Sequence, residues 1–207
     1  MSTLADTLRK APVVPVMVIE ALEDAVPLAR ALVAGGLPVL EITFRTAVAK
    51  DAIRAIIAEV EGAIVGAGTV LDQAQLEDCA RLNCAFAVSP GSSPRLLAAA
   101  KDSRVPLLPG GVTATECMSL LEQGYTVQKF FPAEPAGGAA YLASLGQPLP
   151  QISFCPTGGI GPANARDYLK LKNVITIGGS WMAPKQLIAA KDWAGITALA
   201  RAAAALA

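Results

Sequence analysis

The residue whose chemistry stands out is Lys129, which lies inside the apolar segment TVQKFFP (residues 126–132). It is the only lysine of the chain that falls where a buried strand is expected. Burial disfavours the charged ammonium form, and a neutral amine is a nucleophile whose usual target is a carbonyl carbon. The segment therefore predicts Schiff-base chemistry. The alternative is a lysine at the end of a strand whose amine reaches solvent.

A second ionisable residue, Glu41, stands in the expected strand PVLEITFR (residues 38–45). Side chains alternate between the two faces of a strand, so Glu41 shares a face with Thr43 and Arg45 while the opposite face is apolar. A face that carries an acid, a hydroxyl and a guanidinium is not that of an ordinary core strand. An internal Glu41–Arg45 ion pair or an exposed edge strand would account for the same pattern.

The composition narrows the chemistry further. The chain has 207 residues, of which 53% are hydrophobic and 16% charged, with seventeen basic residues, seventeen acidic residues and no histidine. The balanced charge indicates neither a nucleic-acid partner nor a membrane-surface partner. The lack of histidine excludes histidine-dependent triads, imidazole zinc sites and histidine general bases. We therefore expect neither a metal nor a cofactor.

Two further features bear on the compartment. No apolar run reaches the roughly 18 to 20 residues of a membrane span, and residues 1–10 lack the hydrophobic core of a signal peptide. The four cysteines show no CxxC spacing and suit reduced, buried thiols: Cys79, Cys84, Cys117 and Cys155. We expect a cytoplasmic protein with no membrane contact.

Short β-branched runs alternate with helical patterns along the whole chain. The expected strands are residues 13–19, 38–44, 63–67, 85–89, 105–108, 126–131, 152–155 and 174–177. Expected helix N-caps are Thr46, Asp72, Ser93 and Thr113. Eight such units predict an α/β fold, a closed (β/α)8 TIM barrel forming a single domain over residues 1–207. An open doubly wound sheet is the alternative, but no G-x-G-x-x-G follows the first strand.

A closed barrel would bring the two ionisable residues together. The inward-facing layers of a barrel draw on alternate strands, and Glu41 and Lys129 fall on the second and sixth expected strands. They can therefore face each other across one interior. Closure also removes the edges of the sheet, which disfavours the edge-strand reading of Glu41.

Glycine pairs follow the last two expected strands, in PTGGIG (residues 156–161) and GGS (residues 178–180). Glycine lets backbone N–H groups approach an anion closely, and Thr157 or Ser180 adds a hydroxyl donor. Loops after strands seven and eight of a (β/α)8 barrel commonly bind phosphate. The pattern favours a phosphate site, with tight βα turns as the alternative.

Five segments occur in a specific order and cover most of the chain: LEITFRT (40–46), GAGT (66–69), KFFPAE (129–134), FCPTGG (154–159) and GGSW (178–181). Together they resemble the 2-keto-3-deoxy-6-phosphogluconate (KDPG) aldolases, a short class I aldolase family that includes 4-hydroxy-2-oxoglutarate (KHG) aldolases. The resemblance implies that Lys129 forms the Schiff base and that Glu41 transfers protons. It also implies that Arg45 and Thr69 bind the pyruvate carboxylate. The implied phosphate-binding residues are Thr157, Gly158, Gly159, Gly179 and Ser180.

The expected activity is reversible cleavage of KDPG to pyruvate and glyceraldehyde 3-phosphate, by a homotrimer if the resemblance holds. Activity on 4-hydroxy-2-oxoglutarate stays open. Two other functions remain: a sugar-phosphate isomerase or epimerase on the same barrel, and a non-catalytic sugar-phosphate binding protein. Capture of pyruvate on Lys129 would separate the aldolase from both.

Overall fold

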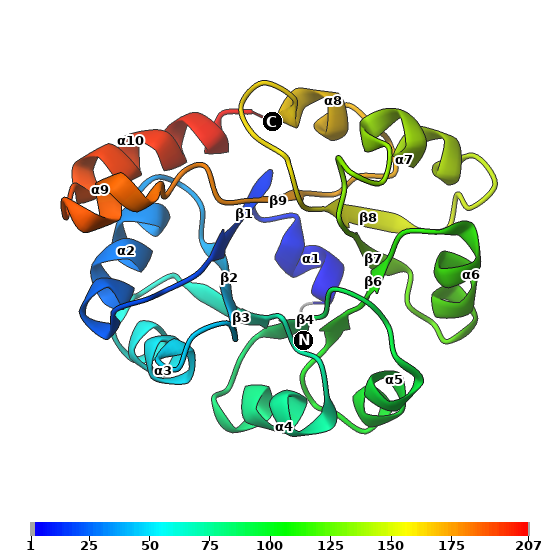
Figure 1. The fold of residues 1–207 in the computed structure, drawn as a ribbon, viewed down its shortest axis with the longest axis horizontal. Coiled ribbons are helices and arrows are strands. Elements are labelled where there is room, and N and C mark those ends of the chain that lie inside the picture. The colour runs from blue at the N-terminus through cyan, green and yellow to red at the C-terminus, as the bar shows by residue number, and fades with distance from the viewer. Residues whose placement is uncertain (1–2, 207) are drawn as a thin grey trace.

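The computed structural model describes residues 3–206, and the strands lie around a centre that the helices surround (Figure 1). The strands are β1 (Val13–Met17), β2 (Val39–Thr43), β3 (Ile64–Gly68), β4 (Phe86–Val88), β5 (Leu107–Leu108), β6 (Gly110–Gly111), β7 (Val127–Phe130), β8 (Ser153–Pro156) and β9 (Ile177–Gly179). The helices are α1 (Leu4–Leu8), α2 (Leu22–Ala34), α3 (Ala49–Glu59), α4 (Gln73–Arg81), α5 (Pro94–Lys101), α6 (Ala114–Glu122), α7 (Gly138–Gly146), α8 (Ala165–Leu169), α9 (Lys185–Ala189) and α10 (Trp193–Ala204).

The strands form two parallel sheets rather than one closed barrel. The larger sheet has six strands in the order β5-β4-β3-β2-β1-β9, and the smaller has three in the order β6-β7-β8. The predicted closed, eight-stranded (β/α)8 TIM barrel is therefore wrong, because the hydrogen-bonded ladder is interrupted in two places.

The two interruptions have local causes. Pro109 separates β5 from β6, and a proline has no N–H to donate to a ladder. On the other side, β8 meets the region of β9 only through the isolated bridges Phe154↔Val174 and Thr157↔Gly178. Regular pairing of the last strand begins at Ile177, so the expected strand over residues 174–177 is displaced toward the glycine pair.

Each strand has one face toward the helices and one toward the interior between the sheets. Leu40 and Ile42 of β2 and Phe130 of β7 belong to the large core under the helices. The smaller interior cluster contains Leu8, Val14, Val39, Phe86, Val88, Leu108 and Cys155. Its member Leu8 comes from α1, which lies across the centre of the ring of strands in Figure 1. This short helix therefore covers one end of the interior with apolar surface.

The structure confirms some of the predicted helix N-caps and contradicts one. Asp72, Ser93 and Thr113 cap α4, α5 and α6 as predicted, the last within a capping box. The predicted cap at Thr46 is wrong: α3 begins at Ala49, and the Thr46 hydroxyl donates to the carbonyl of Ile19 instead. The sequence patterns also missed α1 and α9, which are only five residues each.

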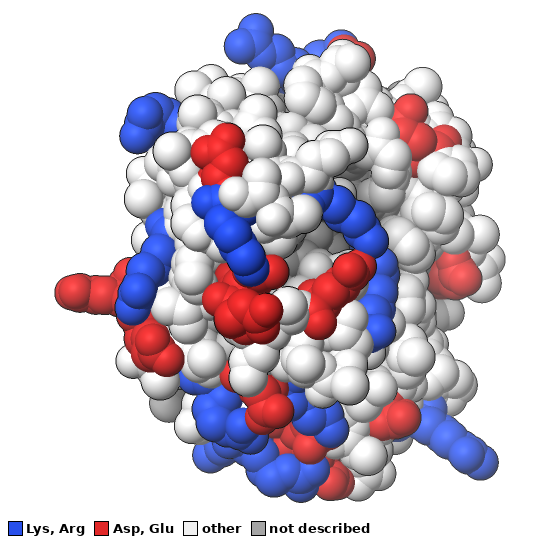
Figure 2. Space-filling model, turned by 60° about the vertical axis from the view of Figure 1, so that its left-hand side comes forward, with Lys and Arg blue, Asp and Glu red and all other residues white. Residues whose placement is uncertain are grey.

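The surface agrees with the balanced charge of the sequence. Acidic and basic side chains are intermixed on the face shown in Figure 2. Exposed ion pairs of the structure include that of Lys185 with Glu20. Within residues 3–206, no helix is both long enough and apolar enough to cross a membrane. The predicted bounds of the domain also include residues 1, 2 and 207, which lie outside the described part of the chain.

Candidate active site

Lys129 occupies an interior position on β7. Its neighbours Gln128 and Phe130 point toward the helices, where Gln128 donates to the carbonyls of Cys117 and Tyr125. Alternation along the strand then directs Lys129 inward, where its side chain is only 5% exposed. The alternative of a lysine whose amine reaches solvent is therefore wrong.

Glu41 faces Lys129 from the other sheet. The Lys129 Nζ atom lies 3.2 Å from Glu41 Oε1, and the two residues are 88 positions apart in the sequence. Glu41 sits on β2, which is flanked by β1 and β3, so the edge-strand alternative is also wrong. Its partner is the lysine rather than Arg45. A buried pair of this kind can exchange a proton without water as an intermediary.

The room for the Glu41 carboxylate comes from a glycine on the adjacent strand. A Cβ atom added to Gly68 would overlap the Glu41 carboxylate, so only glycine permits this rotamer. On the lysine side, the ring of Phe131 lies 5.3 Å from Lys129 Nζ and gives the amine an aromatic neighbour. The Lys129–Glu41 ion pair therefore lies between the backbone of Gly68 and the ring of Phe131.

Cys155 lies beside the pair, directly opposite Lys129 in the β7–β8 ladder. Burial raises the pKa of the Cys155 thiol to about 12, the nearby Lys129 cation opposes that rise, and the Glu41 carboxylate adds to it. The thiol is consequently neutral at physiological pH. It contributes a small apolar surface next to the amine, with no second nucleophile in thiolate form.

Arg45 and Thr69 lie together just beyond the carboxyl ends of β2 and β3. Arg45 Nε donates to the Thr69 hydroxyl over 3.0 Å. Thr69 has a φ of 59°, which is rare for a β-branched residue and is typical of a position under functional constraint. Arg45 is exposed, so its guanidinium remains accessible to a carboxylate from solvent.

The glycine loop after β8 presents several backbone N–H groups without a protein partner in the described chain. Gly158 and Gly159 both have positive φ, at 105° and 78°. Within the described chain, neither their N–H groups nor that of Ile160 donates to another protein group. The buried Thr157 hydroxyl makes no hydrogen bond of regular geometry with a described residue, although it lies near enough to the Cys155 thiol to oppose the rise of that thiol's pKa. These are unused donors, which a bound oxyanion could satisfy.

The other glycine pair brings the last strand against this loop. Thr157 bridges to Gly178, where an added Cβ would overlap the threonine side chain. At Gly179 an added Cβ would overlap the ring of Trp181. Ser180 follows at the exposed end of the strand. The structure thus brings Thr157 and Gly178–Ser180 to one end of the fold.

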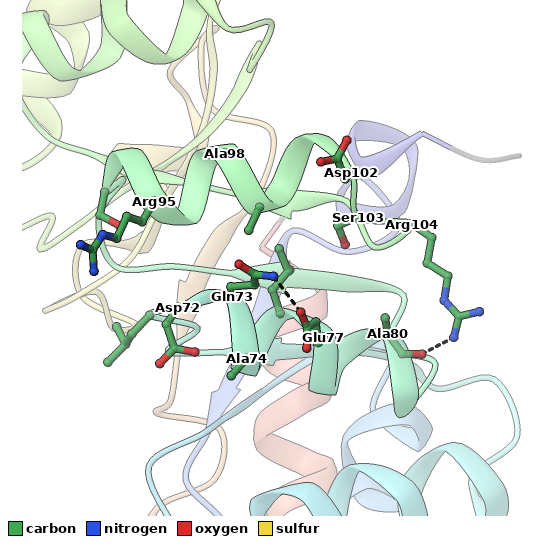
Figure 3. Close-up of a pocket in the computed structure, with 14 residues that line it drawn as sticks. Asp72, Gln73, Ala74, Glu77, Ala80, Arg95, Ala98, Asp102, Ser103 and Arg104 are labelled. Atoms are coloured by element: carbon green, nitrogen blue, oxygen red, sulfur yellow. Dashed lines mark hydrogen bonds between the residues drawn. The ribbon is translucent and has the colours of Figure 1, made fainter.

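A groove of about 1120 Å³ lies elsewhere, between α4 and α5 (Figure 3). Its polar side chains serve local structure: Asp72 caps α4, Gln73 bonds Glu77, and Arg104 donates to the carbonyl of Ala80. Neither Lys129 nor Glu41 lines it. This groove is therefore separate from the candidate site around the buried ion pair.

Sequence reasoning did not single out Cys155, Phe131 or the spacing role of Gly68. Cys155 could have been found from the alternation of side chains along a strand. It lies two residues before the predicted site residue Thr157, and therefore on the same face of the strand. No comparable signal exists for Gly68, whose role depends on a contact between neighbouring strands. Among the described residues, no group of three or more cysteine, aspartate or glutamate side chains is placed to hold a metal ion.

Comparisons with known proteins agree on one family. The family model described as KDPG and KHG aldolase matches residues 4–199. The KHG/KDPG aldolase of Escherichia coli K12 is 54% identical over 92% of this chain and 89% of its own. The 2-dehydro-3-deoxy-phosphogluconate aldolase of Pseudoalteromonas atlantica is 48% identical, over 97% and 93% of the two chains.

A solved structure shows the same fold. The KDPG aldolase from Legionella pneumophila, with pyruvate captured as a covalent carbinolamine intermediate, superposes with a TM-score of 0.95. It is 43% identical to this chain, and the match covers 98% of each chain. The likeness thus extends over nearly all of the molecule.

Proposed function

Because the chain belongs to the KDPG and KHG aldolase family, we propose that it is a class I aldolase. It cleaves KDPG reversibly to pyruvate and glyceraldehyde 3-phosphate. The observation that carries this proposal is the buried Lys129 amine, held 3.2 Å from the Glu41 carboxylate. The covalent pyruvate carbinolamine in the Legionella pneumophila relative supports the same chemistry.

The reaction begins when the neutral Lys129 amine attacks the C2 ketone of the substrate. The resulting carbinolamine takes up a proton from Glu41 and loses water to give a protonated imine, which withdraws electrons from the C3–C4 bond. Removal of the proton from the C4 hydroxyl breaks that bond, releases the aldehyde and leaves pyruvate as an enamine. A proton added to the terminal carbon and a water molecule that hydrolyses the imine then release pyruvate and restore the amine.

Glu41 is the group best placed to move these protons. Its carboxylate contacts the amine directly, and the chain contains no histidine to take the role. We assign it the transfer of the C4 hydroxyl proton and the return of a proton to the enamine carbon. The paired Lys129 can take up a proton from Glu41 or return one as the imine forms and breaks.

Arg45 and Thr69 would bind the carboxylate of the 2-keto acid. The support is their mutual hydrogen bond, the unusual backbone of Thr69 and the capacity of a guanidinium for bidentate binding of carboxylate. The phosphate would lie at the other end of the substrate. Its ligands would be the unused donors of residues 157–159 together with Gly179 and Ser180.

Three finer points belong to the same proposal. The name of the Escherichia coli relative supports 4-hydroxy-2-oxoglutarate as a second substrate. We also propose a homotrimer. Analytical ultracentrifugation would test this, because a trimer has three times the chain mass of 21.2 kDa. A cytoplasmic location would suit a sugar-acid aldolase with reduced cysteines.

The first experiment is to incubate the protein with pyruvate, reduce it with borohydride and locate the adduct by peptide mass spectrometry. The proposal requires an adduct on Lys129 and none on Lys185, an exposed lysine that serves as the internal control. Lys129→Ala should abolish both the adduct and KDPG cleavage. A folded wild-type protein that forms no adduct would refute the class I mechanism.

A further inference from the structure

We infer that Asn164 is a positioning residue that holds the glycine loop in its phosphate-binding conformation and so sets the preference for phosphorylated substrate. This inference rests on the proposed function. The side chain of Asn164 bridges the loop: its Oδ1 accepts from the Gly161 N–H over 2.8 Å, and its Nδ2 donates to the Gly159 carbonyl over 3.1 Å. It thereby closes residues 159–161 into a fixed turn.

The two halves of the loop are fastened in different ways. The first half is held by main chain, because Ala133 N–H donates to the Thr157 carbonyl over 2.8 Å and Glu134 N–H donates to the Gly158 carbonyl over 3.0 Å. In the second half, the backbone N–H groups of Asn164 and Ala165 hold the Gly161 carbonyl, and the Asn164 side chain holds the Gly159 carbonyl and the Gly161 N–H. That side chain is therefore the point at which a substitution can loosen the loop.

Peptide geometry connects this clamp to the free donors. In a trans peptide the carbonyl of one residue and the N–H of the next point in opposite directions. By holding the Gly159 carbonyl, Asn164 fixes the direction of the Ile160 N–H, which donates to no other group in the described chain. Glu134 does the same for the Gly159 N–H by holding the Gly158 carbonyl. Both peptide planes next to Gly159 are thus set by hydrogen bonds.

The choice of asparagine has a specific reason. Asn164 occupies the N-cap position of α8, where asparagine usually accepts from the N–H groups of its own helix. Here it makes no such bond, and its amide is turned back onto the loop. Both a donor and an acceptor are needed at this position, which only an amide side chain of this length supplies. The Asn164 side chain, which could have capped α8, therefore stabilises the loop instead.

The test compares KDPG with 2-keto-3-deoxygluconate, which lacks only the phosphate, in Asn164→Ala and Asn164→Ser variants. We expect kcat/KM on KDPG to fall roughly tenfold or more, mainly through KM, because two hydrogen bonds are lost. Activity on 2-keto-3-deoxygluconate should change by less than about twofold, and the Kd for inorganic phosphate should rise with the KM for KDPG.

The serine variant separates loop positioning from helix capping. Serine caps a helix about as well as asparagine but cannot bridge the loop. Wild-type behaviour of Asn164→Ser, or an equal loss on both substrates, would overturn the inference. Asn173→Ala is the matched control, since Asn173 donates to the carbonyl of Leu142 away from the loop. It should lower stability without altering the ratio of the two activities.

The outcomes also separate this inference from the proposed function. Borohydride trapping of pyruvate does not involve the phosphate loop, so its failure would refute the aldolase, while the Kd for inorganic phosphate in the two variants would still test the role of Asn164 in the loop. Normal trapping in both variants, with an unchanged preference for KDPG, would refute the role of Asn164 alone. Wild-type protein that neither prefers KDPG nor binds inorganic phosphate would refute the phosphate loop and the inference with it.

Discussion

At the scale of single residues, the central fact is that a lysine and a glutamate share one buried interior. Neither charge would be stable there alone, since removing one partner of a buried pair leaves an uncompensated charge that typically costs about 3–5 kcal/mol. The direct contact between Lys129 Nζ and Glu41 Oε1 therefore affects stability as well as the proposed chemistry. The two roles have to be separated by experiment.

Glu41→Gln removes the carboxylate while keeping the size of the side chain and an oxygen that can accept from Lys129. We expect exchange of pyruvate methyl protons with deuterated water, followed by NMR, to slow roughly 10²- to 10⁴-fold. The Kd of pyruvate should change by less than about threefold. Exchange at the wild-type rate would remove Glu41 from the proton-transfer step.

Gly68→Ala tests the position of the carboxylate without altering any ionisable group. The added Cβ overlaps Glu41, so the carboxylate has to move, and a displacement of about 1 Å can reduce kcat roughly 10²-fold. Gly91→Ala is the matched control, because a Cβ at Gly91 meets no atom within 4 Å. Equal kcat values for the two variants in a KDPG cleavage assay would contradict this spacing role.

At the scale of elements, several helices begin at N-cap residues that can be predicted from the local sequence. In α6, the Glu116 N–H donates to the Thr113 hydroxyl, while the Glu116 carboxylate accepts from the N–H groups of Val112 and Thr113. These backbone bonds hold the pKa of Glu116 below its usual range. Stabilisation from this carboxylate is therefore present at neutral pH and is lost as the pH falls through its lowered pKa.

Thr113→Ala should reduce the free energy of unfolding by about 1 kcal/mol, as expected for the loss of an N-cap. Urea denaturation at pH 7 would measure the loss. Thr115→Ala, at an exposed position in the first turn of the same helix, is the control and should cost much less. KDPG cleavage should be unaffected in both variants, since α6 contributes no proposed site residue. An equal effect of the two substitutions would contradict the capping role.

At the scale of the whole molecule, the two sheets are joined through their interior. The Lys129–Glu41 contact crosses from the smaller sheet to the larger one, above an apolar cluster that Leu8 of α1 completes. Buried thiols lie in both apolar clusters, Cys155 in the interior one and Cys117 in the core under the helices. Burial raises the pKa of Cys117 to about 11, with Glu116 adding to the shift, and burial raises that of Cys155 to about 12.

These thiols predict a loss of stability in alkaline solution. Above the ordinary thiol pKa, the unfolded chain releases protons that the folded chain retains, so the free energy of unfolding falls as pH rises toward 11 and 12. Each thiol contributes at most about 1.4 kcal/mol per pH unit in that window. Urea denaturation at pH 8 and pH 10 should show a smaller decline for a Cys117→Ala/Cys155→Ala double variant. An identical decline would rule out Cys117 and Cys155 as its source.

Much of the local structure could be read from the residues themselves. Asp72, Ser93 and Thr113 identified three helix starts correctly, because N-capping depends on side-chain and backbone groups only three residues apart. Thr46 failed because its hydroxyl found a carbonyl on a distant segment. The closed barrel failed for a similar reason: pairing between sheet edges depends on interruptions such as Pro109, which the alternation of strands and helices does not reveal.

The sequence by itself determined which residues could do chemistry, since an amine and a carboxylate inside apolar strands have few other uses and the absence of histidine leaves few substitutes. It also determined their direction, because alternation along a strand is a local property. Only the tertiary structure decided that Lys129 meets Glu41 rather than solvent, that Gly68 makes room for the carboxylate, and that Asn164 clamps the loop. Those contacts join groups on different segments, and their distances depend on how the sheets pack.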